Sequence, residues 1–142
     1  DPGGPTMRGI AWNYNAGWLT ANGYTKQTLH TLTKEDAQRC YYERYWLPSN
    51  ADGLTDIDLA YLHLDSAVQH GVGKAKEFLR NLPKNPKDYD FSDGKNMKLA
   101  VLLFGKYFVQ RLRYYAVCRK FASFGRGWMN RSADIIDNAL DN

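Results

Sequence analysis

The first ten residues gather the side chains of this chain that could most readily take part in chemistry. The segment from Asp1 to Thr6 is a glycine-rich turn that carries one carboxylate and one hydroxyl, and Gly9-Ile10 follows closely. Asp1 can support a positive charge, and Thr6 can hold a water molecule through its hydroxyl group. Gly3-Gly4 alone is a weak signal for a phosphate-binding loop. The turn is therefore a candidate part of a polar site.

The three glutamates of the chain do not resemble buried general acids. Glu35 falls in the first turn of an expected helix, Glu43 follows Arg39 by four residues, and Glu77 lies close to Lys74. A catalytic acid usually needs surroundings that raise its pKa. We therefore interpret all three as surface charges of helices.

Metal chemistry is not favoured by the histidines. His63 and His70 are seven residues apart on one expected helix, which places them roughly 10 Å apart along its axis. This separation is too large for one metal ion. We predict no metal site and no cofactor.

Asp65 and Gln69 lie four residues apart at the edge of the apolar stripe of that helix. In one interpretation Asp65 pairs with a basic residue of the C-terminal region and fixes helix packing. In the other, the two residues form a polar wall of a substrate groove. The residues alone leave both open.

The elements that position these residues are expected to be helices. Apolar spacing and turn signals predict an all-α or mainly α fold with a short irregular or β-hairpin element near the N-terminus. Thr33 is predicted to cap its helix together with Asp36. The expected helices cover residues 12–22, 33–48, 55–71, 73–82, 95–120 and the stretch after a turn at 124–128. We expect the helix at 95–120 to be central and largely buried.

The C-terminal third is strongly basic. Residues 94–133 contain no aspartate or glutamate, whereas the whole chain has a net charge of +4. This pattern suits an anionic polymer such as nucleic acid or cell-wall glycan, or a membrane surface. A solvated basic helix face explains it equally well. No segment is long and apolar enough to span a bilayer, and Cys40 and Cys118 are expected to be free thiols.

Four segments in order resemble one known family. They are Asp1 to Ile10; Leu32-Thr33, Ala37 and Tyr45-Trp46; Asp65 to Gly71; and Arg111 to Tyr115 with Phe124, Gly127-Trp128 and Arg131. Together they resemble the glycoside hydrolase family 108 muramidases, which are lysozyme-like phage and bacterial proteins, and their associated C-terminal peptidoglycan-binding region. Gln69 replaces the asparagine usual in that family.

The resemblance implies hydrolysis of the β-1,4 bond between N-acetylmuramic acid and N-acetylglucosamine. It makes Asp1 a supporting group for the oxocarbenium-like transition state or for water activation, and Thr6 a holder of that water. The family's general acid is the glutamate of a Glu-Gly-Gly-Tyr segment that precedes the position of Asp1. Candidate substrate-binding residues are Tyr24, Trp46, Asp65, Gln69, His70, Tyr114 and Trp128.

Three explanations account for a chain without that glutamate. We favour a chain that is the retained part of a longer protein; the others are a natural non-catalytic relative and a different residue acting as the acid. A partner chain could also complete the site. We expect a lysozyme-like part at 1–82, a hinge at 83–94 and a helical peptidoglycan-binding part at 95–142.

Two other functions remain as alternatives. The first is a non-catalytic cell-wall-binding or phage structural module, and the second is a basic nucleic-acid-binding domain, although no nucleic-acid motif is present. The expected partner is peptidoglycan rather than nucleic acid. The expected location is the bacterial periplasm or cell wall, or a phage particle.

Overall fold

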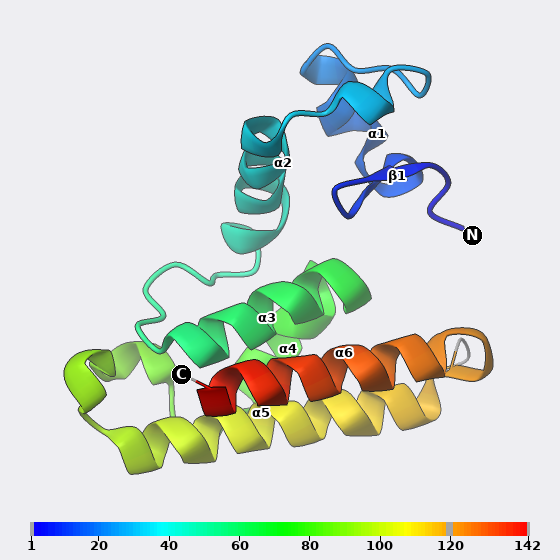
Figure 1. Cartoon of the computed structure of the whole chain (residues 1–142). Helices are drawn as coiled ribbons and strands as arrows, with labels where there is room; N and C mark the ends of the chain where they lie inside the picture. The colour runs from blue at the N-terminus through cyan, green and yellow to red at the C-terminus, as the bar shows by residue number, and fades with distance from the viewer. Residues whose placement is uncertain (1, 119–120, 142) are drawn as a thin grey trace. The chain divides into compact units, whose positions relative to one another are not determined.

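The fold is mainly α-helical, as predicted, with one two-stranded hairpin. The computed structural model describes residues 2–118 and 121–141. Along these residues lie β1 (Thr6–Met7), β2 (Ile10–Ala11), α1 (Trp12–Ala21), α2 (Lys34–Tyr41), α3 (Ile57–His70), α4 (Val72–Arg80), α5 (Met97–Val117) and α6 (Phe121–Asp141), labelled in part in Figure 1. Short 3₁₀ turns occur at Leu29–Thr31, Pro86–Asp88 and Ser92–Gly94, and a π-helical turn occupies Tyr42–Trp46.

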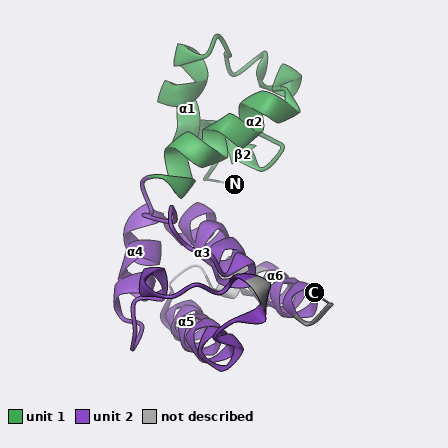
Figure 2. Cartoon of the chain, turned by 90° about the vertical axis from the view of Figure 1, so that its left-hand side faces the viewer, with its two compact units in different colours: residues 1–47 green, residues 48–142 purple. Residues whose placement is uncertain are grey.

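The chain forms two compact units, which Figure 2 colours separately. Unit 1 is Asp1–Leu47 and unit 2 is Pro48–Asn142. The segment 83–94, which the sequence predicts as a hinge, lies inside unit 2 and contains two 3₁₀ turns, and the hinge stays a prediction. The assignment of catalytic and binding roles to 1–82 and 95–142 stays a prediction.

Unit 1 consists of the hairpin, α1 and α2 around a small core. The buried core residues are Ile10, Leu19, Leu29, Leu32, Ala37 and Cys40. Thr33 caps α2 by accepting a hydrogen bond from the backbone N–H of Asp36 at 3.1 Å, as the sequence predicted. After α2 the helix continues as the π-helical turn at Tyr42–Trp46, which the period of 3.6 residues does not reveal.

Unit 2 packs α3, α4, α5 and α6 around a larger core. Its buried members are Leu59, Leu62, Phe78, Leu82, Phe91, Leu103, Tyr107 and Ile135. The predicted turn at 124–128 is wrong, because α6 runs through it. Two glycines there cost the helix about 1 kcal/mol each, and the burial of Ile135 and Ser132 further along α6 offsets this cost.

The prediction of a central, largely buried helix at 95–120 is half right. The helix exists as α5, but only one face is buried, through Leu103, Tyr107, Arg111 and Tyr115. Its other face exposes Val101 and other apolar side chains, so α5 is not the largely buried central helix that its apolar start suggested.

A buried ion pair joins the helices of unit 2. The carboxylate of Asp65 on α3 lies 2.5 Å from Nη2 of Arg111 on α5, and both side chains are almost completely buried. Nε of Arg131 on α6 also contacts Asp65. Arg111 further donates to Ser66 Oγ at 3.1 Å and to Tyr115 Oη at 2.5 Å. One carboxylate therefore links three helices.

His63 fastens the segment before α3 to the core of unit 2. Its Nε2 lies 2.8 Å from the carbonyl oxygen of Ser49 and its Nδ1 lies 2.7 Å from Tyr107 Oη. Because a carbonyl oxygen only accepts, Nε2 carries the proton and Nδ1 accepts from Tyr107. Burial lowers the pKa of His63, which keeps the ring neutral in this role.

The ion pair predicts unequal effects of two matched carboxylate-to-amide changes. Asp65→Asn leaves the buried guanidinium of Arg111 without its counter-charge and should reduce the free energy of unfolding by about 3–5 kcal/mol. Glu77→Gln removes an ion pair with Lys74 whose carboxylate side chain is 46% exposed, so the loss should stay below about 1 kcal/mol. Urea unfolding followed by circular dichroism measures both, and equal losses would show that the buried pair is not essential.

Candidate functional site

The Pro2–Thr6 turn forms the N-terminal cap of α1. Ala11, the residue before α1, has no side chain that caps the helix. Instead, the carbonyl oxygens of Pro5 and Gly3 accept hydrogen bonds from the backbone N–H groups of Trp12 at 2.9 Å and Asn13 at 3.0 Å. These are the first N–H groups of the helix, which have no partner within it. The turn is thereby held against the start of α1.

Asn13 completes this attachment and explains one glycine. Its Nδ2 donates to the carbonyl oxygen of Pro2 at 2.9 Å. Gly4 has a φ of +68°, and a Cβ atom there would lie 3.0 Å from the Asn13 amide. Gly4 therefore serves both the left-handed backbone and the close approach of Asn13. Asn13 was not predicted from the sequence, because it has no recognisable spacing from the turn.

Thr6 is the exposed polar side chain at the end of this turn. Its Oγ1 donates to the carbonyl oxygen of Gly4 at 3.3 Å. With its proton used in this way, the oxygen can accept a hydrogen bond from a water molecule. The position of Asp1 lies outside the described residues, so its predicted partnership with Thr6 stays a prediction.

Two long-range hydrogen bonds fix the hairpin that follows, one from the Tyr41 hydroxyl and one from the Arg8 side chain. Thr6 pairs with Ala11 and Met7 with Ile10, and the two turn residues Arg8 and Gly9 have φ angles of 52° and 80°. Both angles are positive, as a type I′ turn requires. Tyr41 Oη donates to the carbonyl oxygen of Arg8 at 2.8 Å.

Arg8 itself is anchored to the segment before α2. Its Nε donates to the carbonyl oxygen of Leu32 at 2.9 Å. An arginine in the left-handed region is uncommon, and here hydrogen bonds on both its side chain and its carbonyl group hold it. Arg-Gly is not a usual hairpin signal, so the sequence offered only a general expectation of a hairpin.

Asn15 of α1 is a buried polar centre behind the turn. It is 2% exposed, and its Nδ2 donates to the carbonyl oxygen of Ala11 at 3.0 Å. Its Oδ1 accepts from Tyr45 Oη at 3.2 Å and Arg44 Nε at 3.4 Å. The Cys40 thiol also points to this oxygen at 3.9 Å, and burial raises the pKa of Cys40 to about 11. This network joins α1 to α2 and the π-helical turn.

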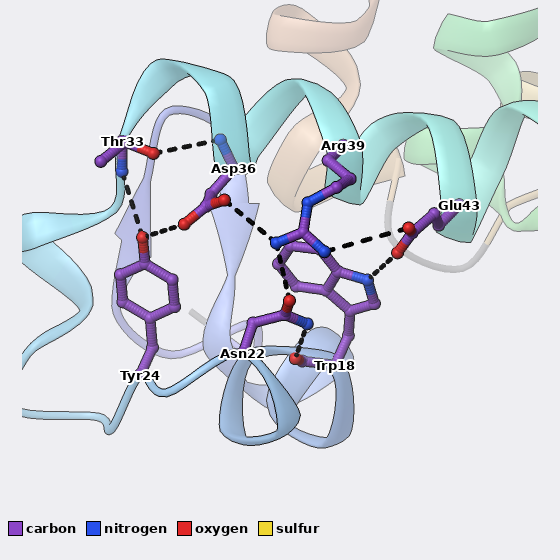
Figure 3. Close-up of polar contacts among 7 residues, drawn as sticks. All are labelled: Trp18, Asn22, Tyr24, Thr33, Asp36, Arg39 and Glu43. Atoms are coloured by element: carbon purple, nitrogen blue, oxygen red, sulfur yellow. Dashed lines mark hydrogen bonds and ion pairs between the residues drawn. The ribbon is translucent and has the colours of Figure 1, made fainter.

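Tyr24 belongs to a polar cluster on the surface of unit 1, shown in Figure 3. Its hydroxyl donates to the carboxylate of Asp36 at 2.5 Å and lies 3.4 Å from the backbone nitrogen of Thr33. The hydrogen bond from Tyr24 is the main cause that lowers the pKa of Asp36, with Arg39 adding to it. The polar end of Tyr24 is thus engaged at the start of α2.

Arg39 occupies the centre of the same cluster. Its guanidinium lies 5.0 Å from the ring centre of Trp18 and donates to Asn22 Oδ1 at 2.7 Å and Asp36 Oδ1 at 3.0 Å. Trp18 Nε1 in turn donates to Glu43 at 2.6 Å. The cluster joins α1 to α2 at the surface of unit 1. Glu43 is a surface residue, as predicted.

The remaining predicted site residues divide between the units. Trp46 is half-buried in the π-helical turn of unit 1. In unit 2, Asp65 is buried and ion-paired with Arg111 and contacted by Arg131, as the packing interpretation expected. Gln69 is half-buried at the end of α3. The side chain of Trp128 lies outside those described.

His70 and Tyr114 do lie together in unit 2. The His70 ring packs edge-on against Tyr114 at 5.0 Å and Tyr115 at 4.9 Å between ring centres. Lys74 Nζ lies 4.9 Å from the Tyr114 ring centre. Desolvation, together with the nearby Arg111, lowers the pKa of His70 to about 4. A neutral ring in this position cannot serve as an acid near neutral pH.

Within each unit the predicted residues are therefore only partly gathered. Unit 1 contains Thr6, Tyr24 and Trp46, whereas unit 2 contains Asp65, Gln69, His70 and Tyr114. Among the described residues, no group of three or more histidine, cysteine or acidic side chains could hold a metal ion. Across the same residues, no helix is both long and apolar enough to cross a membrane.

The glycine at the hairpin turn allows a sharp test of its attachment to α2. A Cβ atom on Gly9 would lie 2.2 Å from Tyr41 Oη, whereas one on Gly23 would meet nothing within 4 Å. Both glycines have positive φ, so each alanine variant bears about 1–2 kcal/mol of backbone strain. We expect Gly9→Ala to reduce the free energy of unfolding by about 1 kcal/mol more, through the lost Tyr41 hydrogen bond.

Thermal and urea unfolding of the two alanine variants measure this difference. In the background of Tyr41→Phe, the hydroxyl that clashes is gone, so the excess cost of Gly9→Ala should shrink. If Gly9→Ala still costs the same amount more than Gly23→Ala in that background, Tyr41 does not contact the turn.

The lowered pKa of His70 predicts a dependence of stability on pH. Between about pH 4 and pH 6.5 the unfolded chain binds a proton at this histidine and the folded chain does not. Stability should therefore fall as the pH decreases through this window. His70→Gln should flatten the slope, whereas His30→Gln at an exposed position should leave it unchanged. Urea unfolding across the window measures the slopes, and identical slopes for the two variants would contradict the assignment.

Comparison with known proteins places this architecture in a family. The family described as Glycosyl hydrolase 108 matches residues 1–71, which include the hairpin, the capping turn and α3. No curated protein matches the chain. A solved structure titled "Structure of Brucella abortus SagA" is similar, with 26% sequence identity and a TM-score of 0.73. The alignment covers 99% of this chain and 82% of that one. The chain belongs to the glycosyl hydrolase 108 family, a lysozyme-like family of cell-wall hydrolases.

Proposed function

We propose that the chain takes part in muramidase chemistry, the hydrolysis of the β-1,4 bond between N-acetylmuramic acid and N-acetylglucosamine in peptidoglycan. The observation that carries the proposal is the Pro2–Thr6 turn, which lies within the matched residues and presents an exposed Thr6 hydroxyl. The hydrogen bonds to Trp12 and Asn13 hold this turn in place. A fixed hydroxyl is the kind of group that orients a water molecule for attack on a sugar.

In this proposal Asp1 and Thr6 have supporting roles. Thr6 holds the water, and Asp1 stabilises the positive charge that develops on the sugar or helps activate the water. The substrate-binding roles of Tyr24, Trp46, Gln69, His70, Tyr114 and Trp128 are part of the same proposal. Asp65 has less support, because its carboxylate is buried against Arg111.

The general acid is proposed to be the glutamate of the family's Glu-Gly-Gly-Tyr segment, outside residues 1–142. The environments of the described carboxylates support this. Glu35 and Glu43 are exposed and Glu77 is half-buried, and Glu43 and Glu77 are paired with basic side chains. Among described carboxyl groups with a resolved shift, only Asp56 has a raised pKa, chiefly from desolvation, and it caps α3. The Asp56 carboxylate is engaged with the backbone N–H of Asp58 at the start of α3.

The lack of a suitable general acid among the described carboxylates also favours a second function. Without a suitable acid, residues 1–142 would bind peptidoglycan without cleaving it, as a cell-wall-binding or phage structural module. Either function places the protein at the cell wall, in the bacterial periplasm or with a phage. The difference between them is the presence of the glutamate.

Turbidity of a peptidoglycan suspension tests the proposal. A chain extended to include the Glu-Gly-Gly-Tyr segment should clear the suspension, and residues 1–142 alone should not. Changing that glutamate to glutamine should abolish clearing. Thr6→Val should lower the rate about ten- to hundredfold, as expected for loss of a positioned hydrogen-bonding group.

Thr20→Val is the matched control, because Thr20 is an exposed threonine on α1 away from the turn. It should leave the rate unchanged. Retained clearing by the glutamine variant would overturn the assignment of the acid. Equal rates for Thr6→Val and the wild-type chain would remove Thr6 from the mechanism.

A further inference from the structure

One exposed face of α5 alternates basic and apolar side chains. The five residues of this stripe follow one another at intervals of three or four, and all are exposed: Lys98, Leu102, Lys106, Val109 and Arg113. Residues at these intervals lie on one side of a helix. We call this set the α5 stripe.

The α5 stripe lies opposite the buried side of its helix. Four buried residues also recur at intervals of four: Leu103, Tyr107, Arg111 and Tyr115. They lie about half a turn around the helix axis from the stripe. They hold α5 against the core of unit 2. The apolar members of the stripe are large and well exposed, with 46% for Leu102 and 41% for Val109.

Among the described residues, no acidic side chain pairs with the cations of the stripe, Lys98, Lys106 and Arg113. α5 itself contains no acidic side chain. Lys106, Val109 and Arg113 also line a shallow hollow of about 340 Å³, together with Asn81 and Gln110. The Gln110 amide nitrogen donates to the carbonyl oxygen of Phe78 at 2.9 Å. The two cations and the Asn81 amide around this hollow suit an anionic group such as a phosphodiester.

The aliphatic side chains between the cations distinguish the class of partner. A hydrated polysaccharide or nucleic acid backbone offers charges and hydroxyls, but exposed leucine and valine gain nothing from them. These side chains gain free energy when they leave water for an apolar medium. Lysine and arginine can extend their stems over such a medium while their charges stay at its surface. Both the aliphatic side chains and the cations of the stripe therefore fit an anionic lipid surface.

We propose that the α5 stripe is a docking surface for an anionic phospholipid bilayer. α5 then lies in the plane of the headgroups, with Leu102 and Val109 inserted and the three cations among the lipid phosphates. It does not span the bilayer, because its charged residues recur along its length. This role is additional to muramidase chemistry and does not depend on it.

Sedimentation with lipid vesicles tests the proposal on the 142-residue chain. The chain should bind phosphatidylcholine vesicles that contain phosphatidylglycerol, and bind pure phosphatidylcholine vesicles far more weakly. Replacing Lys98, Lys106 and Arg113 together with glutamine should weaken binding about a hundredfold, because each basic residue near an anionic surface contributes about fivefold. Added salt should weaken wild-type binding in the same direction.

The matched control replaces Lys26, Lys34 and Lys84, three exposed lysines outside α5, with glutamine. It changes the net charge equally, so binding should be nearly retained if the stripe is responsible. Leu102→Gln with Val109→Gln keeps every charge and should also weaken binding. Circular dichroism of all variants establishes that they are folded.

Three results would overturn the proposal. They are equal binding to vesicles with and without phosphatidylglycerol, equal losses in the stripe variant and the lysine control, and unaltered binding by the leucine–valine variant. A fourth comparison uses purified peptidoglycan without lipid. Binding to it that requires the stripe, without binding to vesicles, would assign the face to a polysaccharide instead.

Discussion

The buried carboxylate of Asp65 is the interaction on which unit 2 depends most. It lies against Arg111 of α5 and Arg131 of α6 and is itself part of α3. A charge in the interior is costly unless its counter-charge is placed accurately. The arrangement of these three helices is therefore restricted to one in which two guanidinium groups meet one carboxylate. The apolar core around Leu62 and Tyr107 then packs within that arrangement.

The capping turn and the hairpin of unit 1 are held by hydrogen bonds to backbone carbonyl groups rather than by ion pairs. The capping turn supplies carbonyl oxygens to the start of α1, and Tyr41 supplies a hydroxyl to the hairpin. Each of these contacts fixes the position of the backbone on which Thr6 lies. The core of unit 1 has only six buried residues, and a two-stranded hairpin this short is marginally stable by itself. The hydrogen bonds therefore contribute to the stability of the hairpin. The candidate catalytic turn is thus also a structural element.

The sequence predicted most helices because their apolar spacing is regular. α3 and α4 are examples, and the cap at Thr33 was recognised from side-chain chemistry alone. The turn predicted at 124–128 failed because glycine was taken as a helix breaker, although packing further along α6 outweighs its local preference. Arg111 was not recognised as a buried residue, because its partner is 46 positions away and arginine is usually exposed. The roles of Asn13 and Tyr41 rest on backbone carbonyl groups, which leave no pattern in a sequence.

The bond that is cleaved is the most direct test of the account. Peptidoglycan digested by a chain that includes the family's glutamate segment can be reduced with borohydride, and its new sugar ends identified by mass spectrometry. Muramidase chemistry predicts reduced N-acetylmuramic acid at those ends, in amounts that rise with digestion time. Reduced N-acetylglucosamine at the new ends, or no new reducing ends at all, would contradict the proposed reaction.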